Sequence, residues 1–260
     1  MFDRKGIITF VAITFVITWS IEAALIAGGL SFIGVPQQFA QLVIVAVMFV
    51  PALSALIVAK IFKDKVVPYG WHLGGAKPYI LVFIFTPIVF ALVYGLTILL
   101  GLGSLDLGLS TFISMVERST GQKLPPIDPA QFITTVLVAS VTFAPFINSF
   151  AALGEEIGWR GYLLPRLVPL GKVKAYPLLG VIWGLWHAPL ILVGFNYPGF
   201  PIAGVFMFVL FTTALSVLMS ELTLKYQSVV LAGWIHGVLN SQGLGIWRVI
   251  VPDAQPLLGG

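Results

Sequence analysis

Cysteine is absent from this sequence of 260 residues, and charged side chains are scarce. Without cysteine, the chain can form no disulfide, no thiolate metal site and no cysteine nucleophile. Only 9% of the residues are charged, whereas a soluble domain has roughly 25%. With 58% hydrophobic residues and a mean hydropathy of +1.02, the composition indicates a multi-pass membrane protein. The net charge of +4 is small and does not indicate a nucleic-acid partner.

Apolar runs recur along the chain at lengths that can cross a bilayer, which takes ~20 residues. We expect seven spans, at about residues 6–28, 39–61, 79–102, 129–155, 176–195, 202–222 and 229–251. The polar stretch between residues 103 and 129 contains, at 107–116, the pattern of an amphipathic helix lying on the membrane. The sequence therefore predicts an all-α transmembrane helical bundle. We expect residues 1–260 to form a single integral membrane domain, with a core motif region at 130–250.

Lysine and arginine are distributed unevenly between the predicted loops. With the N-terminus inside, ten of these cations lie on the cytoplasmic side and three lie outside, and Arg160 is left out of the count. Cytoplasmic loops of membrane proteins are enriched in these residues. The count predicts a cytoplasmic N-terminus. It also places Glu155 and Glu156 at the cytoplasmic end of the fourth span, before a short segment that Pro165 and Pro169 end.

Adjacent glutamates are unusual in a chain with so few charges. Glu156 and Arg160 are four residues apart, the favourable order for a helical ion pair. Glu155 lies about 100° round the helix from Glu156 and can face elsewhere. In such an arrangement Arg160 would hold the Glu156 carboxylate, and the Glu155 carboxylate would remain available to act as a base. The alternative is a pair of interfacial glutamates at a helix end, and we expect Glu22 to be an interfacial residue of that kind.

Two of the three histidines, His187 and His236, lie inside predicted spans. His236 and Asn240 are four residues apart and share a helix face. Such side chains can serve only as packing donors between helices. Their combination with a glutamate pair instead predicts a shared polar site. Small-xxx-small steps accompany the polar residues, at Gly154 and Gly158, Gly180 and Gly184, and Gly233 and Gly237. We expect these steps to let the three helices pack on one another around the site.

The sequence lacks the residue motifs of most known classes of intramembrane protease. No HExxH zinc motif occurs, and every aspartate falls in a predicted loop or terminus. Ser241 lacks the sequence of a nucleophile turn. Water activated by a carboxylate and an imidazole remains, with asparagine and histidine donors for the oxyanion. Zinc held by Glu155, His187 and His236 stays open as an alternative. The ligand spacing favours a site without metal or other cofactor.

Three short motifs together resemble a known family. They are Glu-Glu-x-x-x-Arg at Glu155 to Arg160, an aromatic residue four before His187, and His-x-x-x-Asn at His236 to Asn240. In this order they are similar to the CPBP family, which contains the type II CAAX prenyl endopeptidases and bacteriocin-immunity relatives. The resemblance runs from about residue 148 to residue 240. Trp183 stands where phenylalanine is common in the family.

The resemblance implies an eight-helix intramembrane glutamate-type endopeptidase whose site lies between helices and opens to the cytosol. Seven spans are counted here, and the sequence ends where an eighth would begin. By resemblance, Glu155 and His187 activate water, and His236 with Asn240 holds the oxyanion. Glu156 and Arg160 would orient the site. The implied partners are the lipid bilayer and a membrane-anchored or lipidated protein substrate. One such substrate would be a protein with a prenylated, CAAX-like C-terminus.

Two other functions remain open from the sequence. A non-catalytic immunity or scaffold protein could keep the same motifs, and a transporter could use intramembrane glutamate and histidine as a proton relay. No inverted repeat with paired broken helices supports the transporter. We expect a multi-pass protein of a prokaryotic cell membrane, and the sequence predicts no oligomeric state.

Overall fold

The computed structural model describes residues 3–32, 38–68 and 70–258, and within these ranges the chain is helical with no strand. The longer helices follow the apolar runs of the sequence. They are α1 (Arg4–Ala27), α2 (Gln38–Val47), α3 (Val50–Phe62), α4 (Ala76–Leu99), α5 (Ser110–Thr120), α6 (Pro129–Val141), α7 (Phe143–Glu156), α9 (Lys172–Trp186), α11 (Pro201–Tyr226) and α12 (Val229–Gly243). Shorter elements are the π-helix η1 (Ile157–Leu163), α8 (Leu164–Leu167), η2 (Val168–Leu170), α10 (Ala188–Leu192), α13 (Ile246–Ile250) and η3 (Pro256–Leu258).

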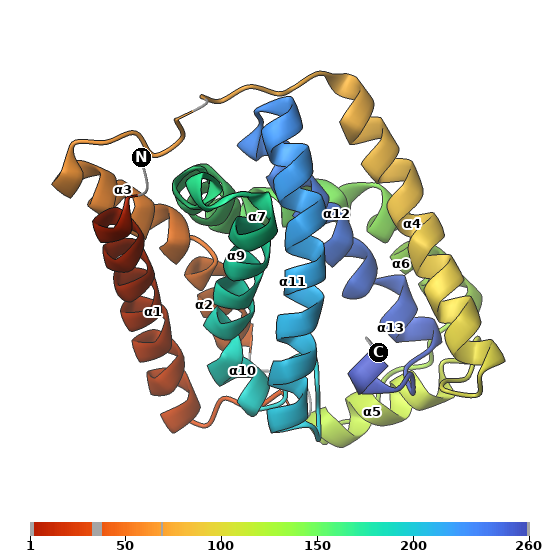
Figure 1. Ribbon diagram of the computed structural model, residues 1–260. Coiled ribbons are helices and arrows are strands. Elements are labelled where there is room, and N and C mark those ends of the chain that lie inside the picture. Colours follow the sequence, from red (N-terminus) through yellow and green to blue (C-terminus); the bar gives the residue numbers. More distant parts are fainter. Residues whose placement is uncertain (1–2, 33–37, 69, 259–260) are drawn as a thin grey trace.

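Two closely packed helix pairs form the centre of the bundle. Helix α7 packs along α12, and α9 packs along α11. Helix α1 closes one side of the bundle, and α4 lies at the opposite side, where most of its surface is exposed (Figure 1). Because α4 is apolar as well as exposed, that surface suits contact with lipid. The central pairs bring residues from α7, α9 and α12 into one region.

The predicted count of seven spans is not confirmed. Four helical stretches of the described residues are long and apolar enough to cross a membrane: α1, Leu42–Phe62, α4 and α11. A fifth arises if α6 and the run Phe143–Leu170, which meet at a 46° bend, count as one span. The remaining two predicted spans are each broken into two helices, at His187 and after Gly243. Helix α9 alone has 15 residues, or ~22 Å, less than the ~30 Å of hydrocarbon.

The break at His187 has a local cause. Pro189 lies in the first turn of α10, and proline lacks the N–H that would continue the hydrogen bonding of α9. Its ring also clashes with a carbonyl of the preceding turn. The helix therefore ends at Trp186 and restarts after His187. A histidine at such a break is held by the ends of two helices.

The glutamate pair does not lie at a helix end as predicted. The helical run continues from Phe143 through the π-helix η1 to Leu170, so Glu155 and Glu156 lie near its middle. Pro165 does not end this run, because it occupies the first turn of α8, where its missing N–H costs little. A π-helix widens the hydrogen-bonded ring and is common at functional sites. The pair is therefore buried deep in the bundle rather than placed at its surface.

The glycine steps permit close helix contacts, but not all of the contacts that we expected. Gly237 of α12 meets the backbone of Ser149 in α7, as predicted. A methyl group added at Gly184 of α9 would lie 2.8 Å from the Cα atom of Val209 in α11. One added at Gly158 would lie 2.7 Å from the carbonyl carbon of Pro51 in α3. The steps thus join α7 to α12, α9 to α11 and η1 to α3, so that only the first of these contacts joins two of the three motif helices.

The end of the bundle that holds most of the predicted cytoplasmic cations is fastened by Arg166. Its guanidinium forms ion pairs with Asp3 and Asp64, and it lies 3.5 Å from the centre of the Tyr162 ring. Burial alone would raise the pKa of Asp64, but the backbone N–H of Lys65 and the Arg166 guanidinium outweigh it and lower that pKa. Arg166 thereby links the start of α1 and the loop after α3 to α8.

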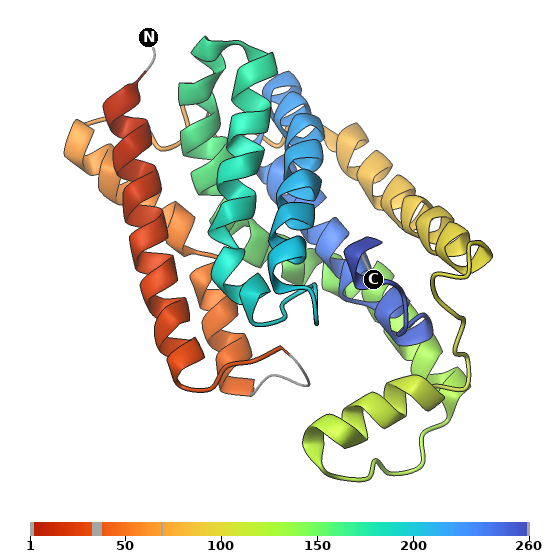
Figure 2. The same ribbon diagram turned by 60° about the horizontal axis from the view of Figure 1, so that its bottom comes forward.

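The predicted amphipathic helix exists as α5, a few residues later than expected. It begins at Ser110 because the Asp106 carboxylate accepts hydrogen bonds from the backbone N–H groups of Ser110 and Thr111. Leu109, with a φ of 58°, turns the chain into the helix. Helix α5 lies across the end of the bundle opposite the N-terminus (Figures 1 and 2).

Candidate active site

Glu156 is the centre of a buried charged cluster. Nη1 of Arg160 donates to both carboxylate oxygens of Glu156, at 3.0 and 2.9 Å. Nδ1 of His236, from α12, lies 3.0 Å from Oε1 of the same carboxylate. Both members of the Glu156–Arg160 pair have 0% exposure. The spacing in the sequence predicts this ion pair, and the structure confirms the contact. Because the carboxylate can only accept, it fixes the orientation of the His236 imidazole and keeps a proton on Nδ1 of that ring.

Glu155 has a different environment from its neighbour. Nε1 of Trp183, from α9, donates a hydrogen bond of 2.9 Å to Oε2 of Glu155. The Arg160 guanidinium lies over the same indole, 4.3 Å from the ring centre. Trp183 thus contacts both parts of the motif on α7 and η1. A phenylalanine at this position would keep the ring under Arg160 but would lack the N–H donor to Glu155.

His187 follows one turn after Trp183, at the break between α9 and α10. Its Nδ1 lies 3.0 Å from the carbonyl oxygen of Trp183, which can only accept, so Nδ1 carries the proton. Nε2 is then the nitrogen with a lone pair. The rings of Trp186 and Phe208 pack on the imidazole with centroids at 4.6 and 4.8 Å. The Trp183 ring packs edge-on against both histidines, with ring centroids 6.2 Å from His187 and 5.3 Å from His236.

Asn240 lies one turn after His236 on α12, as the sequence predicts, and it is half-buried. Within the described ranges, no hydrogen bond joins its side-chain amide to the cluster around Glu156. The six motif residues thus come from α7, η1, the α9–α10 break and α12. The structure brings Glu155, Glu156, Arg160 and His236 together around Trp183, with His187 beside them.

Two contacts of this region and the burial of one residue could not be predicted from the sequence. The bond from Trp183 to Glu155 and that from His236 to Glu156 join separate helices, and no spacing in the sequence reveals them. The prediction that Glu22 is interfacial is wrong, since its exposed fraction is only 1%. Thr14, Thr18 and Glu22 are spaced by four residues in an otherwise apolar helix. That spacing is a signal that could have identified a buried polar face.

The zinc alternative requires three donor side chains that lie close together. Among the described residues, no three His, Cys, Asp or Glu side chains are grouped closely enough to hold a metal ion. Zinc in proteins takes three or four ligands at about 2.0–2.3 Å. We therefore derive no catalytic step through zinc.

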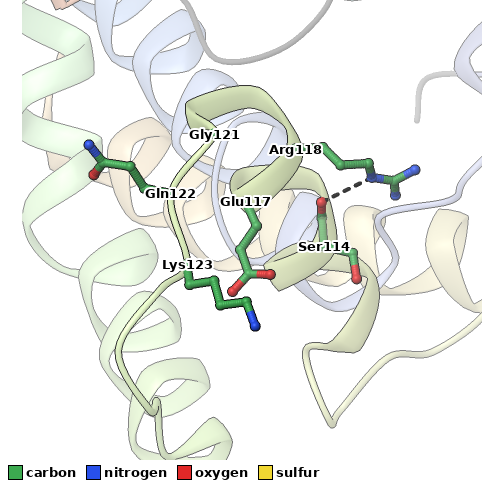
Figure 3. A pocket seen from close by; sticks show the side chains of 6 residues that line it. All are labelled: Ser114, Glu117, Arg118, Gly121, Gln122 and Lys123. Carbon is green, nitrogen blue, oxygen red and sulfur yellow. Dashed lines mark hydrogen bonds between the residues drawn. The ribbon is translucent and has the colours of Figure 1, made fainter.

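A shallow surface pocket lies elsewhere, on α5 and the turn that follows it. Figure 3 shows its lining side chains, which are Ser114, Glu117, Arg118, Gly121, Gln122 and Lys123. None of them belongs to the motifs. Nε of Arg118 donates to the backbone carbonyl of Ser114, so its orientation is set within its own helix. The pocket is separate from the buried polar cluster.

The segment that contains the buried charged cluster is similar to known proteins. Residues 137–242 match the model of the family described as type II CAAX prenyl endopeptidase Rce1-like. A stretch of 61 residues is 44% identical to CAAX prenyl protease 2 of Methanococcus maripaludis and covers 22% of each chain. The aligned part thus spans about a fifth of that relative's length. The matches confirm the resemblance that the motifs indicate: residues 137–242 are similar to the Rce1-like type II CAAX prenyl endopeptidases.

Proposed function

We propose that this protein is an intramembrane endopeptidase that uses Glu155 and His187 to activate water. Its substrates would be membrane-anchored proteins with a prenylated, CAAX-like C-terminus. The division of labour between the two glutamates supports the proposal most strongly. Glu156 is compensated by Arg160 and His236, whereas Glu155 accepts from the neutral indole of Trp183. Glu155 is therefore the carboxylate that can take a proton.

The reaction would proceed by direct attack of water on the scissile carbonyl. Glu155 takes a proton as the water oxygen bonds to the carbonyl carbon, and Nε2 of His187 accepts the second hydrogen bond of that water. His236, protonated on both ring nitrogens, donates Nδ1–H to Glu156 and Nε2–H to the oxyanion of the tetrahedral intermediate, and the Asn240 amide donates to the same oxyanion. The carbon–nitrogen bond then breaks, and the proton held by Glu155 passes to the leaving amine. The second proton of the water passes to Nε2 of His187 as the acid ionises and is then released to solvent, which leaves a carboxylate and an amine as the two products.

Cleavage of a prenylated peptide tests this proposal. Purified protein in detergent is expected to release a short C-terminal fragment from a farnesylated CAAX peptide, detected by mass spectrometry. The same peptide without the farnesyl group is the control and is expected to be cleaved more slowly, because it loses the apolar contribution of the lipid. A strong chelator is expected to leave the rate unchanged. Reversible loss of activity that zinc restores would contradict the mechanism, and absence of any cleavage would favour a non-catalytic role.

We further propose that the N-terminus is cytoplasmic and that the membrane is that of a prokaryotic cell. The uneven distribution of lysine and arginine supports this orientation. Because the chain has no cysteine, single substitutions give single labelling sites. An impermeant thiol reagent added outside is expected to label Gln122→Cys and to spare Lys65→Cys, both of which replace exposed residues. The opposite labelling pattern would reverse the orientation.

A further inference from the structure

Trp183 of α9 is buried among the motif side chains, with an exposed fraction of 2%. Its indole has one polar group, the N–H at Nε1, which can only donate. That group donates to Oε2 of Glu155 at 2.9 Å. A buried aromatic side chain contributes mainly through apolar packing, but this one also places its donor on the carboxylate of another helix. The bond therefore joins α9 directly to the motif on α7.

The orientation of the indole is set by contacts that do not involve Glu155. The Arg160 guanidinium lies 4.3 Å from the ring centre, and a cation is attracted to the face of an aromatic ring. Arg160 is itself held by both carboxylate oxygens of Glu156. The edge of the ring system meets His236, with centroids 5.3 Å apart and planes at 72°. The direction of the indole N–H is therefore fixed by its surroundings, as a preorganised site requires.

The backbone of Trp183 holds His187. In a continuing α-helix, the backbone N–H of His187 would donate to the carbonyl of Trp183. At the end of α9 it donates instead to the carbonyl of Gly184, at 3.2 Å. The Trp183 carbonyl lies 3.0 Å from Nδ1 of His187 and accepts from the ring. Trp183 thus holds Glu155 by its side chain and His187 by its backbone, and these are the two groups that the proposed function assigns to the water.

We propose that Trp183 is a positioning residue whose indole N–H holds Oε2 of Glu155, which leaves Oε1 as the oxygen that takes the proton from water. This role rests on the proposed function of Glu155 as the base. A hydrogen bond to a carboxylate is charge-assisted and stronger than one between neutral groups. Because Trp183 also holds His187, the bond orients the carboxylate relative to the imidazole. Without the N–H donor, the carboxylate can rotate, and fewer of its orientations suit proton transfer.

Two replacements of Trp183 remove the N–H donor and keep an aromatic ring under Arg160. The first is Trp183→Phe, and the second is β-(3-benzothienyl)alanine, in which sulfur replaces the N–H and the shape of tryptophan is kept. A hydrogen bond to a charged group corresponds to about 10- to 100-fold in rate. We expect both to lower kcat on the farnesylated peptide by about that factor, with KM nearly unchanged. Trp247→Phe, which removes an indole donor bonded to the neutral side chain of Gln242, is the control and is expected to keep wild-type kcat.

A double-mutant cycle separates this role from a structural one. If the indole acts through the base, adding Trp183→Phe to Glu155→Gln is expected to leave the small residual kcat nearly unchanged. A further loss as large as that in the wild-type background would assign Trp183 to the structure of the site and overturn the role. Wild-type kcat in either replacement of Trp183 would also overturn it. Thermal unfolding in the same detergent shows which variants are folded, and the benzothienyl variant decides the matter if Trp183→Phe does not fold. Failure of the proposed function is recognised separately, by wild-type turnover in Glu155→Gln.

Discussion

Replacement of Arg160 by alanine is expected to cost about 3–5 kcal/mol of unfolding free energy, because it leaves the buried Glu156 carboxylate without its guanidinium. Both side chains of the pair are fully buried, so water cannot compensate the charge that remains. The same change removes the cation that lies over the Trp183 ring. Since Glu156 also holds His236 and Trp183 also holds Glu155, cleavage should fall together with stability.

The measurement is unfolding of purified Arg160→Ala protein in detergent, with cleavage assayed on the fraction that remains folded. Lys172→Ala is the matched control, because it also removes a cation paired with a glutamate. The Lys172–Glu221 pair is about half exposed, so solvent replaces the lost partner and the unfolding midpoint should change little. Equal unfolding midpoints for Arg160→Ala and Lys172→Ala would show that the buried pair does not stabilise the site.

Part of this site is predictable because its contacts are local. Glu156 and Arg160 are one helical turn apart, so the sequence alone determines that they can pair. The same holds for the common face of His236 and Asn240 on α12. The long apolar helices α1, α4 and α11 are equally predictable, since their composition determines that they can cross a membrane.

The contacts that assign roles to the two glutamates are not local. Trp183 reaches Glu155 from α9, and His236 reaches Glu156 from α12, so both depend on how the helices pack. Hydrophobicity also cannot show that Pro189 breaks a span beside His187, because such breaks are tolerated where protein surrounds the backbone. Glu22 was misassigned for a related reason: its depth depends on the partners of α1 and not on its distance from the helix end.

Replacement of Glu155 by glutamine is expected to remove turnover while preserving the fold. Glutamine has nearly the same shape and can still accept the hydrogen bond from Trp183, so the packing around Glu155 should persist. It cannot take a proton from water, and loss of a general base typically costs about 10²–10⁴ in rate. The ion pair of Glu156 with Arg160 is untouched, so the unfolding temperature should stay close to that of the wild type.

Mass spectrometry of the fragments that purified Glu155→Gln protein releases from the farnesylated CAAX peptide tests the central assignment most directly. Glu221→Gln, which alters an exposed glutamate at the far end of α11, serves as the matched control. We predict that wild-type and Glu221→Gln proteins release the C-terminal fragment at similar rates, and that folded Glu155→Gln protein releases it at least about 10²-fold more slowly. Release by Glu155→Gln at the wild-type rate would contradict the assignment of Glu155 as the base that activates water.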